Sequence, residues 1–333
     1  MNNTNRIAYW DNLKAVLIFL VVLGHFLYPG KNNSGRSVDA VLYFIYMFHM
    51  PAFVFVSGHF SKRYVQRGAS DVRKLVGFLV LYVFLYVALW LINVVFERDI
   101  TMLFIFTTYS AQWYLMCMFL WYLVIPYCAK MRPIPMMALS ILSALIVGID
   151  SKAGPFLALS RFFVFLPFFL AGYYFDESLL GRIKPWMKGL AACLLLAALL
   201  FAYKYSAIIE PNWSSILCGN KAYSSYKTGI PTRFVWYFAS SLLVASMMCL
   251  TPKGKTFYTY LGQRTLAIYI IHRIIEGICG QAGLFDHVGS GVRMICICII
   301  ISLVVTVASS EKHFTTLFNK AFSAEYKFLV QNE

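Results

Sequence analysis

Lys14 and His25 are the residues of this chain whose types and spacing most directly suggest chemistry. A lysine can bind an anion, and a neutral histidine can take up a proton. The two lie eleven residues apart in an almost wholly apolar run, which predicts a membrane-spanning helix. Eleven residues return a helix to within about 20° of its start and advance it by roughly 16 Å, so both side chains share one face. A histidine placed deep in a membrane is costly unless it has a function or a partner.

Two further histidines are predicted at membrane depth. His49 falls in the middle of the second apolar segment, two residues before the helix-kinking Pro51. His272 falls in the ninth segment, with Arg273 beside it and Glu276 one turn on, where His272 and Glu276 can share a face. A single such histidine is as well explained as a hydrogen-bonded packing residue. Three in separate segments together predict a polar cavity inside a helical bundle.

The remaining candidate residues each have a structural and a functional interpretation. Trp113, which opens the fourth segment, suits an interfacial aromatic belt or a binding site. Arg161, at the start of the sixth segment, suits a snorkelling anchor or a ligand contact. The cationic loop after the second segment suits either topological anchoring or a clamp for a phosphate-rich cytoplasmic ligand. Its residues are Arg63, Arg67, Arg73 and Lys74.

Composition indicates an all-α, polytopic membrane protein. Of 333 residues, 60% are hydrophobic and only 13% charged, about half the charged fraction of a soluble domain. The apolar segments lack the strict alternation of barrel strands, so helices are expected. About ten transmembrane helices are predicted, near 13–29, 39–60, 75–96, 113–129, 134–149, 160–176, 186–206, 233–251, 259–281 and 292–310.

The distribution of charge predicts an orientation rather than a nucleic-acid partner. The net charge is +15, but most of the 29 basic residues fall on the inner side if the N-terminus is inside. This bias predicts that both termini are cytoplasmic, with the excess positive charge contacting anionic lipid headgroups. No nucleic-acid partner is expected.

The chain is expected to form one integral membrane domain over 1–311, followed by a short cytoplasmic tail over 312–333. The first apolar run lacks a small-residue cleavage site and is expected to stay as a span. The outer segment 207–232 is predicted to be the longest loop, a place where lids and binding surfaces occur. The eight cysteines have no metal-ligand spacing and suit small buried apolar residues, so no metal is predicted.

Five stretches, in order, resemble the membrane acyltransferase 3 family, and within it the fucose 4-O-acetylase-like branch. The family signature is a basic residue, ten residues and then histidine; here the basic residue is Lys14, where many members have arginine. The stretches are 9–25, which begins YWDNLK and ends with Gly24 and His25, FHMPAFVFVSG at 48–58, QWYL at 112–115, LPFFLAGY at 166–173 and YLGQRTLAIYIIH at 260–272.

This resemblance implies transfer of an acyl group, most often acetyl, from cytoplasmic acetyl-CoA to a hydroxyl of a cell-surface polysaccharide or lipid-linked sugar. It implies a multi-pass protein of the bacterial cytoplasmic membrane. His25 would serve as general base or covalent acyl relay, Lys14 and the cationic loop would bind the CoA phosphates, and Asp11 would orient Lys14. His272 would be a second candidate, for proton relay or oxyanion stabilisation. Further contacts would come from His49, Trp113 and Arg161, the last two near the acceptor entrance.

Two alternatives belong to other classes. Intramembrane histidines beside Arg273 and Glu276 also suit a proton-coupled transporter or exporter of a glycan or small solute. The two halves show no inverted repeat and no matching pair of broken helices, which disfavours this alternative. The other is a catalytically inactive relative that exports a glycan or acts as a scaffold.

Overall fold

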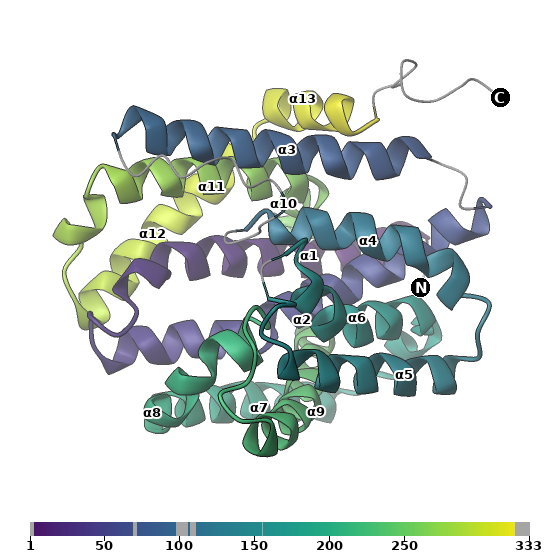
Figure 1. Cartoon of the computed structure of the whole chain (residues 1–333). Coiled ribbons are helices and arrows are strands. Elements are labelled where there is room, and N and C mark those ends of the chain that lie inside the picture. Colours follow the sequence, from purple (N-terminus) through teal and green to yellow (C-terminus); the bar gives the residue numbers. More distant parts are fainter. Residues whose placement is uncertain (1–2, 69–71, 98–105, 107–110, 155, 324–333) are drawn as a thin grey trace. The chain divides into compact units, whose positions relative to one another are not determined.

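The computed structural model describes residues 3–68, 72–97, 106, 111–154 and 156–323, with only the backbone of 3–7 and 321–323. The described residues are mostly helical and contain no strand, which confirms the all-α prediction (Figure 1). The helices are α1 Asn3–Leu27, α2 Arg36–Gln66, α3 Val72–Val95, α4 Trp113–Cys128, α5 Pro133–Ile146, α6 Leu159–Tyr174, α7 Pro185–Lys204, α8 Ser206–Ile209, α9 Tyr226–Leu250, α10 Thr259–Gln263, α11 Thr265–Gln281, α12 Gly291–Ser309 and α13 Lys312–Ser323.

Each predicted apolar segment coincides with a helix. Among the described residues, six helices are long and apolar enough to cross a membrane, namely α1, α2, α3, α7, α9 and α12. Helices α4, α5 and α6 are apolar but shorter. Helix α11 carries Arg273 and Glu276 and is also short, at 17 residues. Several apolar helices therefore define a multi-pass membrane protein, while the count of ten spans and the cytoplasmic placement of both termini stay predictions.

The ninth predicted segment is divided. Helix α10 ends at Gln263, Arg264 leaves helical geometry with φ −118° and ψ 19°, and α11 starts at Thr265. The Arg264 guanidinium donates to the carbonyl of Ser310 at 2.7 Å. The pattern of apolar residues does not show this break. Arg264 and Gly262, which lie at the break, contact residues from distant parts of the chain, and a local pattern contains no information on such contacts.

The segment 207–232 is mostly helical, so the prediction of a long loop there is wrong. Its first part forms α8, a 3₁₀ turn at Glu210–Asn212 and a π-helical turn at Trp213–Leu217. Helix α9 begins at Tyr226, which leaves only 218–225 outside regular helices. Gly229 of α9 lies against the ring of Tyr223, where a Cβ would come within 2.3 Å of a ring carbon.

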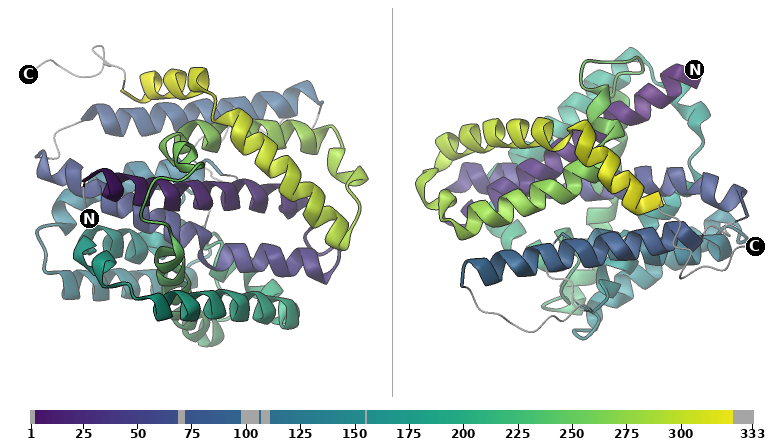
Figure 2. Two further views of the ribbon diagram at one scale, coloured as in Figure 1. Left: turned by 180° about the vertical axis from the view of Figure 1, so that it is seen from behind. Right: turned by 90° about the horizontal axis from the view of Figure 1, so that it is seen from above.

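One compact unit, called unit 1, comprises Met1–Phe53, Phe175–Leu217 and Pro231–Glu311. In it, α1 packs against α10, α11 and α12 (Figures 1 and 2). Trp10, Leu13 and Leu17 of α1 are at most 2% exposed, because their face of the helix is covered by neighbours. Gly262 of α10 permits the closest approach: a Cβ there would lie 1.8 Å from the carbonyl oxygen of Asp11.

The other compact unit, called unit 2, comprises Val54–Tyr174, Cys218–Ile230 and Lys312–Glu333. Within it, Gly58 of α2 and Gly172 of α6 each face backbone of the other helix, and a Cβ at either would come within 1.8 Å of a carbonyl oxygen. Helix α13 lies along α3 (Figure 1), where Phe318 is 6% exposed and packs on Phe84 at 5.7 Å between ring centroids. The first half of the predicted tail is therefore a packed helix, and 324–333 lies outside the described residues.

We expect Gly262→Ala to destabilise the protein by about 1–3 kcal/mol or more, because the new methyl group would overlap backbone of α1 that cannot move aside as a side chain can. Thermal unfolding of the purified protein in detergent checks this. The matched control is Gly189→Ala in α7, where nothing lies within 4 Å of the built Cβ and the higher helix propensity of alanine should leave stability unchanged or raised. Equal stability of the two variants would contradict the close approach at Gly262.

Candidate active site

His25 and His272 meet inside unit 1. His25 lies near the C-terminal end of α1 and His272 near the middle of α11, and their ring centroids are 5.3 Å apart. His272 is completely buried, whereas His25 keeps part of its surface accessible. Nδ1 of His272 donates to the carbonyl oxygen of Ile268 at 2.7 Å, a bond that fixes the ring on its own helix. Two of the three predicted intramembrane histidines are thus brought together.

Arg273 and Glu276 complete this cluster. The Arg273 guanidinium donates to Nδ1 of His25 at 3.2 Å and to Oε2 of Glu276 at 2.5 Å. Both side chains of this ion pair are largely buried, at 11% and 13% exposed. A buried charge must be paired, and here the carboxylate neutralises the guanidinium that contacts His25. Glu276 thus pairs with Arg273, its neighbour at i−3, in addition to sharing a helix with His272.

The other end of α1 carries Lys14 and Asp11. Nζ of Lys14 lies 2.9 Å from Oδ1 of Asp11, one turn away on the same helix, and the two side chains are 20% and 7% exposed. Oδ2 of Asp11 accepts a hydrogen bond of 3.1 Å from the amide of Gln263 in α10. The carboxylate is held from both sides, so it fixes the position of the Lys14 ammonium. Lys14 and His25 lie on one uninterrupted helix, as the apolar run between them predicted.

Asn12 anchors this end of α1. It is fully buried and its amide donates to the carbonyls of Pro252 and Gly254, at 2.9 and 2.7 Å. Its Oδ1 accepts from the hydroxyls of Thr256 and Thr259, at 2.9 and 2.6 Å. All four hydrogen-bonding positions of the amide are therefore used. Asn12 ties α1 to the segment that leads into α10, and so sets the positions of Asp11 and Lys14.

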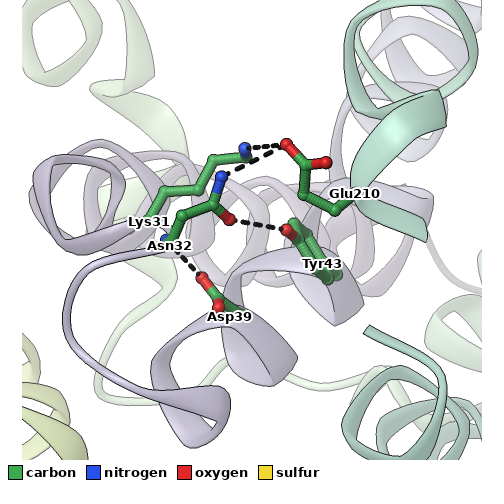
Figure 3. Close-up of polar contacts among 5 residues, drawn as sticks. All are labelled: Lys31, Asn32, Asp39, Tyr43 and Glu210. Carbon is green, nitrogen blue, oxygen red and sulfur yellow. Dashed lines mark hydrogen bonds and ion pairs between the residues drawn. The ribbon is translucent and has the colours of Figure 1, made fainter. Parts of the chain in front are cut away.

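A second polar network follows the C-terminal end of α1 (Figure 3). Oε1 of Glu210 accepts from Lys31 at 3.3 Å and from the Asn32 amide at 3.2 Å. Tyr43 donates to Oδ1 of Asn32 at 3.2 Å, and Asp39 accepts from the Asn32 backbone at 2.8 Å. Asn32 adopts a φ of 66°, a conformation that asparagine tolerates better than most residues. The network holds the chain just beyond His25 against α2 and the segment after α8.

His49 lies in an aromatic cluster of unit 1. Its Nδ1 donates to the carbonyl of Ile45 at 2.8 Å, and its ring meets the edge of Tyr46 at 4.7 Å between centroids. The ring centroids of Tyr46 and Trp213 are in turn 4.4 Å apart. His49 is 4% exposed, so these contacts fit the packing interpretation of this residue; its predicted role in binding stays a prediction.

In unit 2, Arg161 and Trp113 lie together. The Arg161 guanidinium carbon is 4.9 Å from the Trp113 ring centroid, a cation–π contact, and Nε donates to the carbonyl of Cys218 at 3.1 Å. Both residues are buried, with Arg161 7% exposed. Arg161 therefore does not snorkel alone at the surface. It pairs with Trp113, and the contact of these two residues with an acceptor stays a prediction.

The cationic loop residues also belong to unit 2. Arg63, Arg67 and Arg73 are exposed, as expected of either anchors or phosphate contacts. Lys74 differs, because its ammonium lies over the rings of Tyr122 and Tyr64 at 4.5 and 5.8 Å. The structure gives Lys74 a packing role that its sequence position did not reveal.

Several residues that shape the site were not assigned a role from the sequence. Arg273 lies in a predicted span, but the sequence does not show its contact with His25, because the two residues are 248 positions apart. Asn12 and Gln263 lie inside stretches that resemble the family, and this resemblance is the only feature of the sequence that points to a role for them. Their partners come from distant segments, and one sequence does not show such pairings.

The sequence profile of the acyltransferase 3 family, described as an acyltransferase domain, matches residues 7–311. Comparison with curated proteins and with solved structures gave no match. The fold and the family define a multi-pass membrane acyltransferase. The chain belongs to the acyltransferase 3 family, because the matched region covers nearly all of it and includes Asp11, Lys14, His25, His272 and Arg273.

We expect Arg273→Gln to destabilise the protein by about 3 kcal/mol, because it leaves the largely buried Glu276 carboxylate without its ion-pair partner. The double variant Arg273→Gln, Glu276→Gln removes both charges and should recover most of the loss. Thermal unfolding in detergent of the wild type, both single variants and the double variant measures this coupling as a double-mutant cycle. Additive effects of the two substitutions would contradict a coupled buried pair.

Proposed function

We propose that the protein is a membrane-embedded O-acyltransferase that moves an acyl group, acetyl as the first choice, from cytoplasmic acyl-CoA to a sugar hydroxyl. The observation that carries the proposal is the contact of His25 with the buried His272, inside a chain that belongs to an acyltransferase family. The acceptor class is a cell-surface polysaccharide or lipid-linked sugar, in keeping with the resemblance to the fucose 4-O-acetylase-like branch. The proposed location is a bacterial cytoplasmic membrane.

The pair supplies what acyl transfer to a hydroxyl needs. A sugar hydroxyl is a poor nucleophile at neutral pH and gains reactivity when a base accepts its proton during attack on the thioester carbonyl. The carbonyl oxygen gains negative charge in that step and is stabilised by a fixed hydrogen-bond donor. Two imidazoles 5.3 Å apart can serve as base and donor around one reacting carbon. His25, the histidine of the family signature, is also the more accessible of the two.

Lys14 supports the choice of an acyl-CoA donor. Its ammonium is one-fifth exposed and held in place by Asp11, so it is fixed yet still within reach of an anionic ligand. A phosphate group of CoA is a suitable partner for such an ammonium. The acyl-bearing arm would then extend along α1 toward His25, about 16 Å further along the helix axis. Arg63, Arg67 and Arg73 are exposed and stay predicted contacts for the same class of anion.

A proton-coupled transporter is the second candidate function. The buried ion pair of Arg273 and Glu276 in contact with His25 is the observation that favours it, since such groups occur in proton relays. Family membership favours the transferase. The two functions differ in whether a thioester is consumed.

We expect Lys14→Ala to raise the apparent KM for acetyl-CoA about tenfold, because one charge-assisted contact to phosphate is lost, and to leave kcat less affected. Lys14→Arg should stay close to the wild type, since arginine keeps the charge and can still reach Asp11. Steady-state kinetics on membranes containing each variant measure both constants. An unchanged KM in Lys14→Ala would leave the donor site without support.

We expect cells that produce the wild type to carry O-acyl esters on their surface glycan that are absent without the protein and in His25→Ala. NMR spectroscopy and mass spectrometry of the isolated polysaccharide detect these esters and identify the acceptor hydroxyl. Immunoblotting of membranes controls for production of the variant. Identical ester content in all three strains would contradict the transferase, and proton-driven uptake that survives in His25→Ala would favour the transporter.

A further inference from the structure

The hydrogen bonds of the histidine pair determine which nitrogen of each ring carries the proton. A guanidinium can only donate, so Nδ1 of His25, 3.2 Å from Nη1 of Arg273, must accept and therefore has no hydrogen. In neutral His25 the hydrogen is then on Nε2. A carbonyl oxygen can only accept, so Nδ1 of His272, 2.7 Å from the oxygen of Ile268, must donate. In neutral His272 the lone pair is then on Nε2.

Nε2 of His272 is also an orphaned acceptor. His272 is 0% exposed, and this nitrogen has no hydrogen-bond partner in the part of the chain that the structure describes. Leaving a buried polar atom unsatisfied costs about 1–3 kcal/mol, so such an atom in a native protein calls for an explanation. A hydroxyl group of a bound substrate would supply the missing donor. His25 differs, since its unprotonated nitrogen already accepts from Arg273.

We infer that His272 is the general base of the proposed acyl transfer and that His25 is the hydrogen-bond donor to the thioester carbonyl, with Arg273 as the positioning residue that fixes the tautomer of His25. This assignment rests on the proposed function and reverses the roles that the family signature alone suggests. The two ring centroids are 5.3 Å apart, which brings both imidazoles within reach of one reacting group.

The step balances with these two groups. Nε2 of His272 takes the proton of the acceptor hydroxyl while its oxygen forms a bond to the thioester carbon. Nε2–H of His25 donates to the oxygen that becomes negative in the tetrahedral intermediate. The carbon–sulfur bond then breaks, and the CoA thiolate takes the proton from His272. The products are an O-acyl ester and free CoA, and no covalent acyl-histidine forms.

Glutamine substitutions separate a donor from a base. A glutamine amide can donate a hydrogen bond from near the position of Nε2, but it cannot take up a proton. His25→Gln should therefore stay within about tenfold of wild-type kcat/KM, while His25→Ala, which removes the donor, should lose about 10²–10³-fold. His272→Gln should lose about 10²–10⁴-fold, as expected when a general base is removed. His287→Gln, at an exposed position outside the cluster, is the matched control and should be unchanged.

The assay uses membranes of the native host, deleted for its own copy and producing each full-length variant. The initial rate of transfer of radiolabelled acetyl from acetyl-CoA to the endogenous glycan is measured from pH 5 to 9. His25→Gln should keep the acidic limb of the wild-type pH profile of kcat/KM, and His272→Gln should lose it. A merely structural role of His272 would lower the rate without changing the shape of the profile.

The outcomes distinguish the two proposals. If the wild type transfers no acetyl, the proposed function fails and this inference fails with it. If the wild type is active, the inference requires both the tenfold or greater advantage of His25→Gln over His25→Ala and the loss in His272→Gln. Any other pattern, or recovery of a peptide acetylated on His25 after reaction with acetyl-CoA, overturns the assignment and leaves the transferase standing.

Discussion

Arg273 donates a hydrogen bond to His25, and this contact joins α11 to α1 at the position where the family signature places its histidine. An arginine can be buried there only because Glu276 neutralises it one turn further along the same helix. The ion pair thus makes possible a polar site in an otherwise apolar bundle. It also settles which nitrogen of His25 bears the hydrogen, and so links an electrostatic requirement of the fold to the chemistry that the site can perform.

The rest of unit 1 serves to keep α1 in place. The side-chain amide of Asn12 forms four hydrogen bonds that hold the N-terminal half of α1 to the segment before α10 and to α10 itself. Gly262 allows the backbones of α1 and α10 to come into contact. At the other end, Glu210 and Asn32 fasten the chain just after His25 (Figure 3). Lys14 and His25 lie on one helix, so fixing both of its ends fixes the distance between the predicted phosphate contact and the proposed reacting centre.

Much of the architecture could be predicted, because apolar segments of sufficient length specify helices wherever they occur. All ten predicted segments coincide with helices, and the shared helix of Lys14 and His25 follows from the apolar run between them. The break at Arg264 and the helical turns over 206–217 could not be predicted, since they accompany contacts between distant segments rather than a local pattern. The contact of Arg273 with His25 depends on how α11 is rotated about its axis relative to α1. The pattern of apolar residues along α11 does not specify this rotation.

The central claim is that the pair of His25 and His272 transfers an acyl group from a thioester. The most direct measurement is release of CoA thiol from acetyl-CoA by the purified full chain in lipid vesicles, with and without isolated surface glycan. The account predicts release by the wild type that rises with glycan and falls to background in His25→Ala. Absence of CoA release by a folded wild type, together with proton movement across the vesicle membrane, would contradict it.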